Sequence, residues 1–402
     1  MVELAGERVT TQMKLRTLAA AAILLLFGCS TTPTKYSSTP YVTSTIPLRI
    51  VSANDGDANQ PSGSERLDSI TVIDVSRDAP PQTRTVIGTV PNTFNGAPSF
   101  AIISDGTYAV IPNHSWGQSG KSSQLPSQIS VVDLDSTELK TVATLPLPEH
   151  AWQTAAHPDG ERVMVISDHH LHLIEFDSGL PRIAAKSEFF PLFFISFAVS
   201  PDGNSVIATA ADEIAYSAAV ELHLFRLEEG EIRHMRRIEI DPEVGKIDQP
   251  FAPRFSPDGS RALVLNGLGL AGRPPQDAVL SIDLTLEVPR VTEAIPHVAQ
   301  GLESVAFHPS GDFAVVTCID GPYVGHLAVI DLSVSPMRLL YYLPMDVIPQ
   351  GIEFSPDGEM LFVQVIMADH IDVYRVDGKN LIKSPYVLHT GEGPASMALI
   401  QR

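Results

Sequence analysis

Glu303 is the residue of this sequence that is best placed for acid–base chemistry. It opens the segment Glu303-Ser304-Val305-Ala306-Phe307, and equivalent segments elsewhere place Gln350, Trp152, Phe251, Ile195 and Pro98 at the same position. A single carboxylate with mostly apolar counterparts can have a raised pKa and act as a proton donor or acceptor. No second carboxylate aligns with it, so the sequence does not indicate a paired-carboxylate glycosidase.

Three neighbouring histidines, His169, His170 and His172, suggest a metal site at first sight. However, His170, His326 and His370 each lie five residues before the same position of a recurring strand, so they belong to separate repeats. Only His172 shares a strand face with His170. We therefore expect these imidazoles to be spread around the molecule, and we expect no metal centre. No dinucleotide, P-loop, nucleophile-elbow or haem-attachment motif occurs in a suitable context, so no cofactor is expected.

A short turn phrase recurs along the chain and indicates which elements carry these residues. It reads HPDG at 157–160, SPDG at 200–203, 256–259 and 355–358, and HPSG at 308–311, with a degenerate SDG at 104–106. Proline presets φ, aspartate caps the backbone and glycine accepts positive φ, so the phrase predicts a tight turn between two strands. The spacing is roughly 50 residues, which is typical of propeller blades.

A second recurring run predicts seven such units. It appears as SITVIDV (69–75), QISVVDL (128–134), LHLIEF (171–176), LHLFRL (222–227), VLSIDL (279–284), LAVIDL (327–332) and IDVYRV (371–376). The last apolar segment, 394–400, matches a first strand, whereas the segment 46–51 matches a second strand. The sequence therefore predicts an all-β, seven-bladed β-propeller, closed by a C-terminal first strand that joins an N-terminal three-strand blade.

The lead-in Gly391-Glu392-Gly393-Pro394, the SPDG turns and the VIDL-type strands resemble the YVTN-type bacterial β-propeller repeats and the related lactonase-like propellers. The resemblance covers about residues 46–402. It implies the fold, and it leaves the function open because propellers carry enzymes, ligand binders and scaffolds alike. Lactonase-like propellers use polar residues at the mouth of the channel, but no catalytic set can be matched to this chain residue by residue.

In a propeller, the loops between second and third strands share one face with the loops between blades. Here the former are long, at 53–68, 112–127, 211–219, 266–277 and 318–325, whereas the opposite turns are short. Long loops on one rim are where binding residues usually lie. The candidate ligand-binding residues of this rim are His114, Trp116, His150, Trp152, Tyr216, Arg273, Glu303, Tyr323 and Gln350.

The N-terminus has the features of an export signal. Lys14 and Arg16 precede an apolar run from Leu18 to Phe27, and Cys29 follows in a sequence that resembles a bacterial lipobox. We expect a signal peptide at 1–28, a lipid on Cys29, a flexible tether at 29–45 and the propeller at 46–402. By the same resemblance, Ser30 favours sorting to the outer membrane. The apolar run is too short to remain as a transmembrane helix.

The composition excludes several kinds of partner. The 47 acidic and 27 basic residues give a formal charge of -20, which argues against binding nucleic acid. Loss of the signal peptide would leave the charge near ~-21. Cys29 and Cys318 are the two cysteines, so with Cys29 lipidated Cys318 would be an unpaired thiol.

Two functions are compatible with these observations. We expect a monomeric, membrane-anchored binding module in the periplasm or at the surface, which uses the rim to hold a protein, peptide or glycan. The alternative is a periplasmic lactonase-type hydrolase or sugar-acid lyase with its site at the channel mouth. The negative charge disfavours an anionic substrate unless basic residues such as Lys121 or Arg273 create a local positive pocket.

Overall fold

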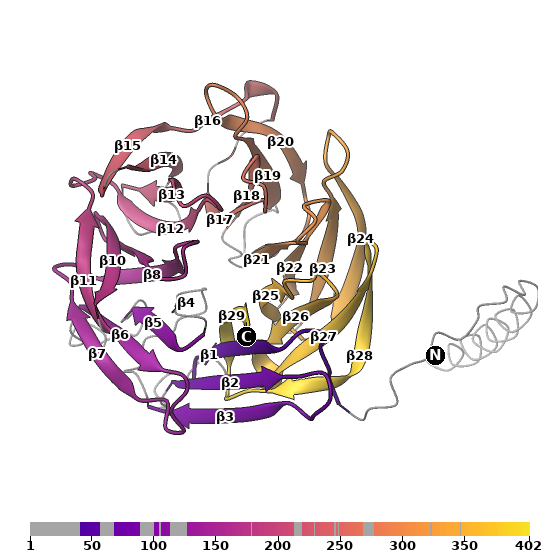
Figure 1. Ribbon diagram of the computed structural model, residues 1–402. Helices are drawn as coiled ribbons and strands as arrows, with labels where there is room; N and C mark the ends of the chain where they lie inside the picture. The colour runs from indigo at the N-terminus through magenta and orange to yellow at the C-terminus, as the bar shows by residue number, and fades with distance from the viewer. Residues whose placement is uncertain are drawn as a thin grey trace, which may run out of the picture. The chain divides into compact units, whose positions relative to one another are not determined.

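The computed structural model describes residues 41–56, 68–88, 100–103, 106–112, 127–177, 179–212, 219–228, 230–244, 247, 249–267, 277–321, 324–345 and 347–402. Seven antiparallel sheets are arranged as a ring, as Figure 1 shows in a view down the central axis. This confirms the seven-bladed β-propeller that the repeats predict.

Each blade begins with an innermost strand and ends with an outermost one. Blade 1 contains β29 (Pro394–Gln401), β1 (Leu48–Asn54), β2 (Ser69–Val75) and β3 (Gln82–Ile87). Blade 2 contains β4 (Ala101–Ile103), β5 (Tyr108–Pro112), β6 (Gln128–Asp133) and β7 (Thr141–Pro146). Blade 3 contains β8 (Ala151–Ala156), β9 (Val163–Ser167), β10 (Leu171–Asp177) and β11 (Leu180–Lys186). Blade 4 contains β12 (Phe193–Val199), β13 (Ser205–Ala211), β14 (Val220–Glu228) and β15 (Glu231–Arg237).

The remaining three blades follow the same plan, with one addition. Blade 5 contains β17 (Pro250–Phe255), β18 (Arg261–Asn266), β19 (Ala278–Asp283) and β20 (Arg290–Pro296), and the short β16 (Glu239–Ile240) pairs with β20 as a fifth, parallel strand. Blade 6 contains β21 (Gly301–Phe307), β22 (Phe313–Gly321), β23 (Val324–Asp331) and β24 (Arg338–Met345). Blade 7 contains β25 (Pro349–Phe354), β26 (Met360–Val365), β27 (His370–Asp377) and β28 (Asn380–His389). Two short 3-10 helices occur in connections of the described part of the chain, η2 (Pro242–Val244) and η3 (Ile366–Ala368).

Apolar side chains of the second and third strands fill the space between neighbouring blades. Val315, Val329, Leu361 and Val363, for example, belong to one buried cluster of blades 6 and 7. These strands are buried on both faces, so they have continuous apolar sequences, whereas outer strands such as β3 alternate between exposed and half-buried residues. This packing is what holds the blades around the axis.

The turn phrase has the conformation that its residues predict. All six of its glycines, Gly106 among them, have positive φ angles between 72° and 86°. The two histidine-containing copies also connect neighbouring blades, because His157 Nε2 lies 3.2 Å from Gly203 O and His308 Nε2 lies 3.1 Å from Gly358 O. The Nδ1 atom of each ring accepts a backbone N–H, so Nε2 carries the proton and donates.

One predicted loop, 318–325, is mostly strand. β22 runs to Gly321, and β23 begins at Val324. The two strands continue their pairing through Ile319 and Gly325. Because Ile319 and Val324 favour extended backbone, the hairpin extends into the segment that was predicted as a loop.

The two ends of the described chain are joined in blade 1, as predicted. β29 pairs with β1 from Leu48–Gln401 to Ala53–Ser396. Gln364 of blade 7 reinforces this seam, donating from Nε2 to Ser52 Oγ (2.7 Å) and to Ser396 O (2.9 Å). Val42 is buried in an apolar cluster together with Leu48 and Ile50 of β1, so the chain already packs on the ring before β1 begins.

Among the described residues, Arg49 in β1 is the largest fully buried side chain, and it connects blade 1 to blade 2. Its Nε donates to Asp74 Oδ1 (2.7 Å) within blade 1. Its Nη1 donates to Asp135 Oδ1 (2.7 Å) and Gly106 O (3.0 Å) in blade 2. The Arg49 side chain is 2% exposed, so these partners must stabilise its positive charge in place of water.

Candidate active site at the channel mouth

The seven innermost strands enclose a central cavity of about 720 Å³. Its wall is largely apolar, with Phe197, Val305 and Ile352 among the lining residues, and the Pro-containing turns surround one end. Arg254 of β17 reaches Glu353 of β25, with Nη2 lying 2.8 and 2.7 Å from the two carboxylate oxygens. This ion pair joins blades 5 and 7 past blade 6 and lies close to the turn end of the cavity.

A bulge near the start of several inner strands determines which side chains depart from the regular alternation. In β21, Leu302 pairs with Cys318 and Ser304 pairs with Thr317, which leaves Glu303 without a partner. The same irregularity falls at Trp152 in β8 and at Ile195 in β12. An unpaired bulge residue is re-aimed relative to its neighbours. The bulge therefore falls at three of the residues that the sequence alignment placed at one position, Glu303, Trp152 and Ile195.

In blade 5 the sequence alignment points to Phe251, but the bulge begins one residue later in the chain. Phe251 of β17 pairs regularly with Leu265, and the irregularity falls at Ala252 and Pro253. Ala252 has a positive φ of 45°. In blade 7 the shift includes both Gln350 and Gly351. Proline and glycine therefore move the bulge in a way that simple alignment of the turn phrases does not reveal. Pro98 lies outside the described residues.

Glu303 and Gln350 are brought together across the boundary between blades 6 and 7. The Gln350 side chain hydrogen-bonds the half-buried Glu303 carboxylate. Thr317 links the two inner strands, because Ser304 N donates to its Oγ1 (2.9 Å) and its Oγ1 donates to Gln350 O (3.0 Å). The site is therefore held by hydrogen bonds between strands, which keeps its geometry fixed.

Burial raises the pKa of Glu303 to about 7, and the hydrogen bond from Gln350 opposes that rise. A carboxyl group in this range is present both protonated and ionised near neutral pH. It can then accept a proton from a substrate or water and return it in a later step. This is the acid–base role that the sequence suggested for Glu303.

Asp277 is a second unusual carboxyl that the sequence analysis did not select. It precedes β19, its side chain is 6% exposed, and its Oδ2 has no hydrogen-bond partner among the described residues. Burial raises its pKa to about 7. The signal available in the sequence was its position at the end of the predicted loop 266–277. Its desolvation depends on what packs around it, which the loop pattern does not show.

Cys318 lies within electrostatic range of both carboxyl groups. The free thiol is buried, and burial is the main cause of its raised pKa, with Asp320, Asp277 and Glu303 acting in the same direction. A thiol whose pKa is raised remains protonated at neutral pH, so Cys318 is not suited to be a nucleophile.

We expect Asp277→Asn to stabilise the protein increasingly as the pH rises from about 4 to about 7. A carboxyl whose pKa is higher in the folded state than in the unfolded state costs stability once the unfolded chain ionises. This cost grows until the folded-state pKa is passed, and asparagine does not ionise. Thermal unfolding of both proteins across this range measures the effect. An equal melting-temperature difference at every pH would contradict it.

His150 is the one remaining predicted rim residue whose side chain the structure describes. His150 belongs to the connection before β8, is half exposed, and has Nδ1 3.9 Å from Asp168 Oδ2. His114, Trp116, Tyr216, Arg273 and Tyr323 lie outside the described residues, as does the side chain of Trp152.

The aligned histidines have separate partners in separate blades. His170 Nδ1 lies 2.9 Å from Glu149, His326 contacts Asp320, and His370 Nε2 lies 3.3 Å from Asp372. His172 is buried beside Ser167, and burial lowers its pKa to about 4. Within the described part of the chain, no group of three or more His, Cys, Asp or Glu side chains could hold a metal ion.

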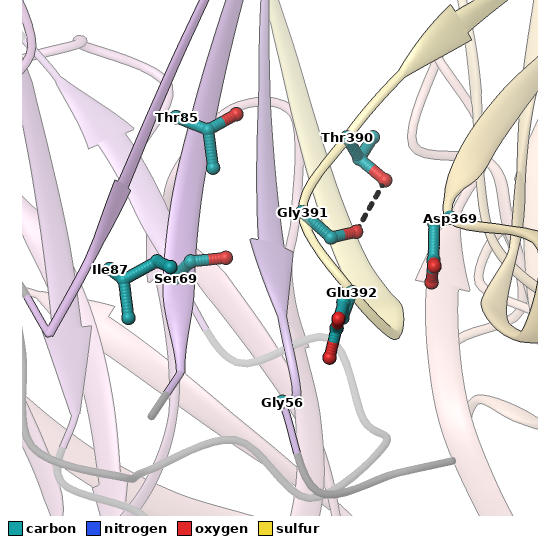
Figure 2. Close-up of a pocket in the computed structure, with 8 residues that line it drawn as sticks. All are labelled: Gly56, Ser69, Thr85, Ile87, Asp369, Thr390, Gly391 and Glu392. Carbon is teal, nitrogen blue, oxygen red and sulfur yellow. Dashed lines mark hydrogen bonds between the residues drawn. The ribbon is translucent and has the colours of Figure 1, made fainter. Parts of the chain in front are cut away.

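A second pocket, of about 400 Å³, lies where blade 1 meets blade 7. Figure 2 shows Ser69, Thr85 and Ile87 of the blade 1 strands on one side of it, facing Asp369 and the segment Thr390–Glu392 on the other. We call it the seam pocket. It shares no lining residue with the central cavity among the described residues.

Comparison with known proteins shows the fold. No protein-family model matches the chain, and no curated protein matches it. A proposed 6-phosphogluconolactonase from Bacteroides fragilis has a TM-score of 0.64 at 12% identity, over 90% of this chain and 99% of that one. The periplasmic gluconolactonase of Pseudomonas aeruginosa has a TM-score of 0.61 at 15% identity, over 88% and 99%. Hydrazine synthase of Kuenenia stuttgartiensis also aligns, with a TM-score of 0.56 at 14% identity.

Proposed function

We propose that this protein hydrolyses sugar lactones, with Glu303 as the general base. The observation that carries the proposal is the half-buried Glu303 carboxyl, which precedes the cavity-lining Ser304 in the inner strand β21, hydrogen-bonds Gln350 and has its pKa raised by burial to about 7. The structural similarity to proteins described as gluconolactonases supports the same choice. We therefore favour the hydrolase over the binding module that the sequence favoured, because the structural neighbours include proteins described as gluconolactonases.

The reaction requires one group that can both accept and donate a proton. Ionised Glu303 would take a proton from water as the water oxygen attacks the lactone carbonyl. When the tetrahedral intermediate collapses, the ring C–O bond breaks, and the departing oxygen takes the proton from Glu303. The product is a hydroxy acid. Gln350 would hold the carboxylate in position during both transfers.

The charge of the chain favours an uncharged lactone as substrate. The formal charge of the chain is -20. A phosphorylated lactone would approach a negatively charged protein against repulsion. The hydroxy acid that forms is an anion, so the same field favours its release.

Incubation of the purified protein with uncharged sugar lactones tests this function. We expect ring opening faster than the spontaneous reaction for glucono-δ-lactone or a related lactone, measured by acid release. A phosphorylated gluconolactone and a polyuronate extend the panel to anionic lactones and to the lyase reaction. Cleavage of the polyuronate alone would favour the lyase. Failure of the whole panel, together with specific binding of a glycan or peptide, would favour the binding module.

We propose further that a lipid on Cys29 anchors the protein to the outer membrane. The support is the basic flank, the apolar run and the cysteine described above, all of which lie outside the described residues. Within the described residues, no helix has the length and apolar character that crossing a membrane requires. We expect Cys29→Ala to abolish acylation and to move the protein from the membrane fraction to the soluble fraction. Continued acylation of this variant would contradict the proposal.

A further inference from the structure

The seam pocket is built from segments far apart in the chain, and its floor is held by hydrogen bonds between them. Gly391 N donates to Thr71 Oγ1 (3.0 Å), and Asn54 Nδ2 donates to Ser69 Oγ (3.0 Å). A Cβ atom at Gly391 would lie 2.2 Å from Ser69 Oγ, so only glycine permits this approach. The polar groups of the floor are therefore fixed before any ligand arrives.

The opposite wall is equally constrained. Asp369 has a left-handed backbone conformation with φ 54°, and its Oδ1 accepts a hydrogen bond from Gly393 N (2.9 Å). Its Oδ2 makes no hydrogen bond to a described residue. Thr390 Oγ1 donates to Gly391 O (2.9 Å), which leaves the lone pairs of this hydroxyl available to a ligand. Figure 2 shows the Asp369 and Glu392 side chains on the same side of the pocket.

The chemistry of the lining matches a ligand with several hydroxyl groups. Carboxylates and hydroxyls accept hydrogen bonds from O–H donors, and such bonds are strong when the acceptor is charged. Ile87 is 67% exposed and offers an apolar surface at the edge. The described lining includes two acidic side chains and no Lys, Arg or His. The volume of about 400 Å³ falls within the usual range for small-ligand pockets.

We propose that the seam pocket binds an uncharged, monosaccharide-sized polyhydroxylated ligand. Anionic sugar acids are disfavoured, because the Asp369 carboxylate would repel them. The site is separate from the channel and does not depend on the proposed hydrolysis. A ligand here would contact blade 1 and the connection from blade 7 together, and so would stabilise the closed ring.

Ligand-observed NMR with D-glucose, D-galactose and N-acetyl-D-glucosamine, each up to about 50 mM, tests the proposal, with D-gluconate as the charged comparison. We expect at least one neutral sugar to bind and gluconate to bind more weakly. Asp369→Asn and Thr390→Val should each weaken binding about tenfold. Asparagine can keep the acceptor for Gly393 and tolerates the left-handed backbone, so this variant is expected to fold. Glu359→Gln, in an exposed turn at the opposite end of the blades, is the matched control and should bind normally.

Three results would overturn the proposal. The first is no binding by any of the three sugars at the highest concentration. The second is binding of gluconate as tightly as of the neutral sugars. The third is binding that is unchanged in Asp369→Asn and Thr390→Val but lost in Glu303→Gln, because this would place the sugar in the channel. Circular dichroism and thermal unfolding verify that each variant is folded.

Discussion

Replacing Glu303 with glutamine is expected to lower kcat/KM for lactone hydrolysis by roughly 100-fold to 1000-fold. Glutamine has nearly the same shape and can still hydrogen-bond Gln350, but it cannot accept a proton from water. The loss should therefore appear in the chemical step, with a smaller change in KM. Steady-state hydrolysis of the best lactone of the panel measures it. Glu359→Gln, an exposed carboxyl far from the mouth, is the control and should retain full activity.

The pH dependence separates a catalytic role of Glu303 from a structural one. Because its pKa is raised to about 7, activity of the wild-type protein should rise with pH and level off above neutrality. The glutamine variant should lack this rise. It should also be at least as stable as the wild type at about pH 8, since a carboxyl whose pKa is raised by folding costs stability once the pH exceeds its unfolded-state pKa, and this cost is complete above its folded-state pKa. A variant that retains wild-type kcat/KM would exclude Glu303 as the base.

Replacing Arg49 with methionine is expected to lower the free energy of unfolding by about 3 kcal/mol. The change removes a buried cation that connects blade 1 to blade 2 through Asp74, Asp135 and Gly106 O. The effect should fall at the lower end of the range for broken buried ion pairs. Arg84 and Arg402 remain near the two carboxylates, at 3.8 and 3.0 Å, and partly compensate their charges.

Urea unfolding of the two proteins measures this difference. The control is Arg226→Met, which removes an exposed arginine 3.9 Å from Glu228 and should change stability by less than about 1 kcal/mol. The Arg49 pair also makes a contribution that depends on pH. Burial opposes ionisation of Asp135, but Arg49 and Arg402 lower its pKa overall, so the contribution is present at neutral pH and is lost as the pH falls through that lowered pKa. Equal stability of Arg49→Met and wild type would show that the ring does not need this connection.

Much of the fold was predictable because its signals are local. Each Pro-Asp-Gly turn specifies its own backbone, and the glycines have the positive φ that the turn requires. Closure was predictable as well, since an unmatched first strand at 394–400 and an unmatched second strand at 46–51 complete each other. The exception, the hairpin at 318–325, depends on strand pairing that continues through glycine-containing segments.

The candidate site was predictable only in part. Aligned turn phrases placed Glu303 and Gln350 at one level of the ring, and the structure brings these two side chains together. Phe251 was misplaced because Ala252 and Pro253 take up the irregularity of β17. Asp277 was missed because an aspartate that ends a polar loop looks like any solvated residue until its surroundings are known.

The sequence alone determined the number of blades, the way the ring closes and the position of Glu303 at the start of an inner strand. These follow from repeated local patterns, which hold wherever the repeat occurs. Only the tertiary structure decided that Glu303 and Asp277 are desolvated and that Arg49 connects two blades. The seam pocket likewise exists only in the tertiary structure, because its lining residues come from both ends of the propeller sequence. Desolvation and ion pairing depend on groups far apart in the chain, and no local pattern records which of them will meet.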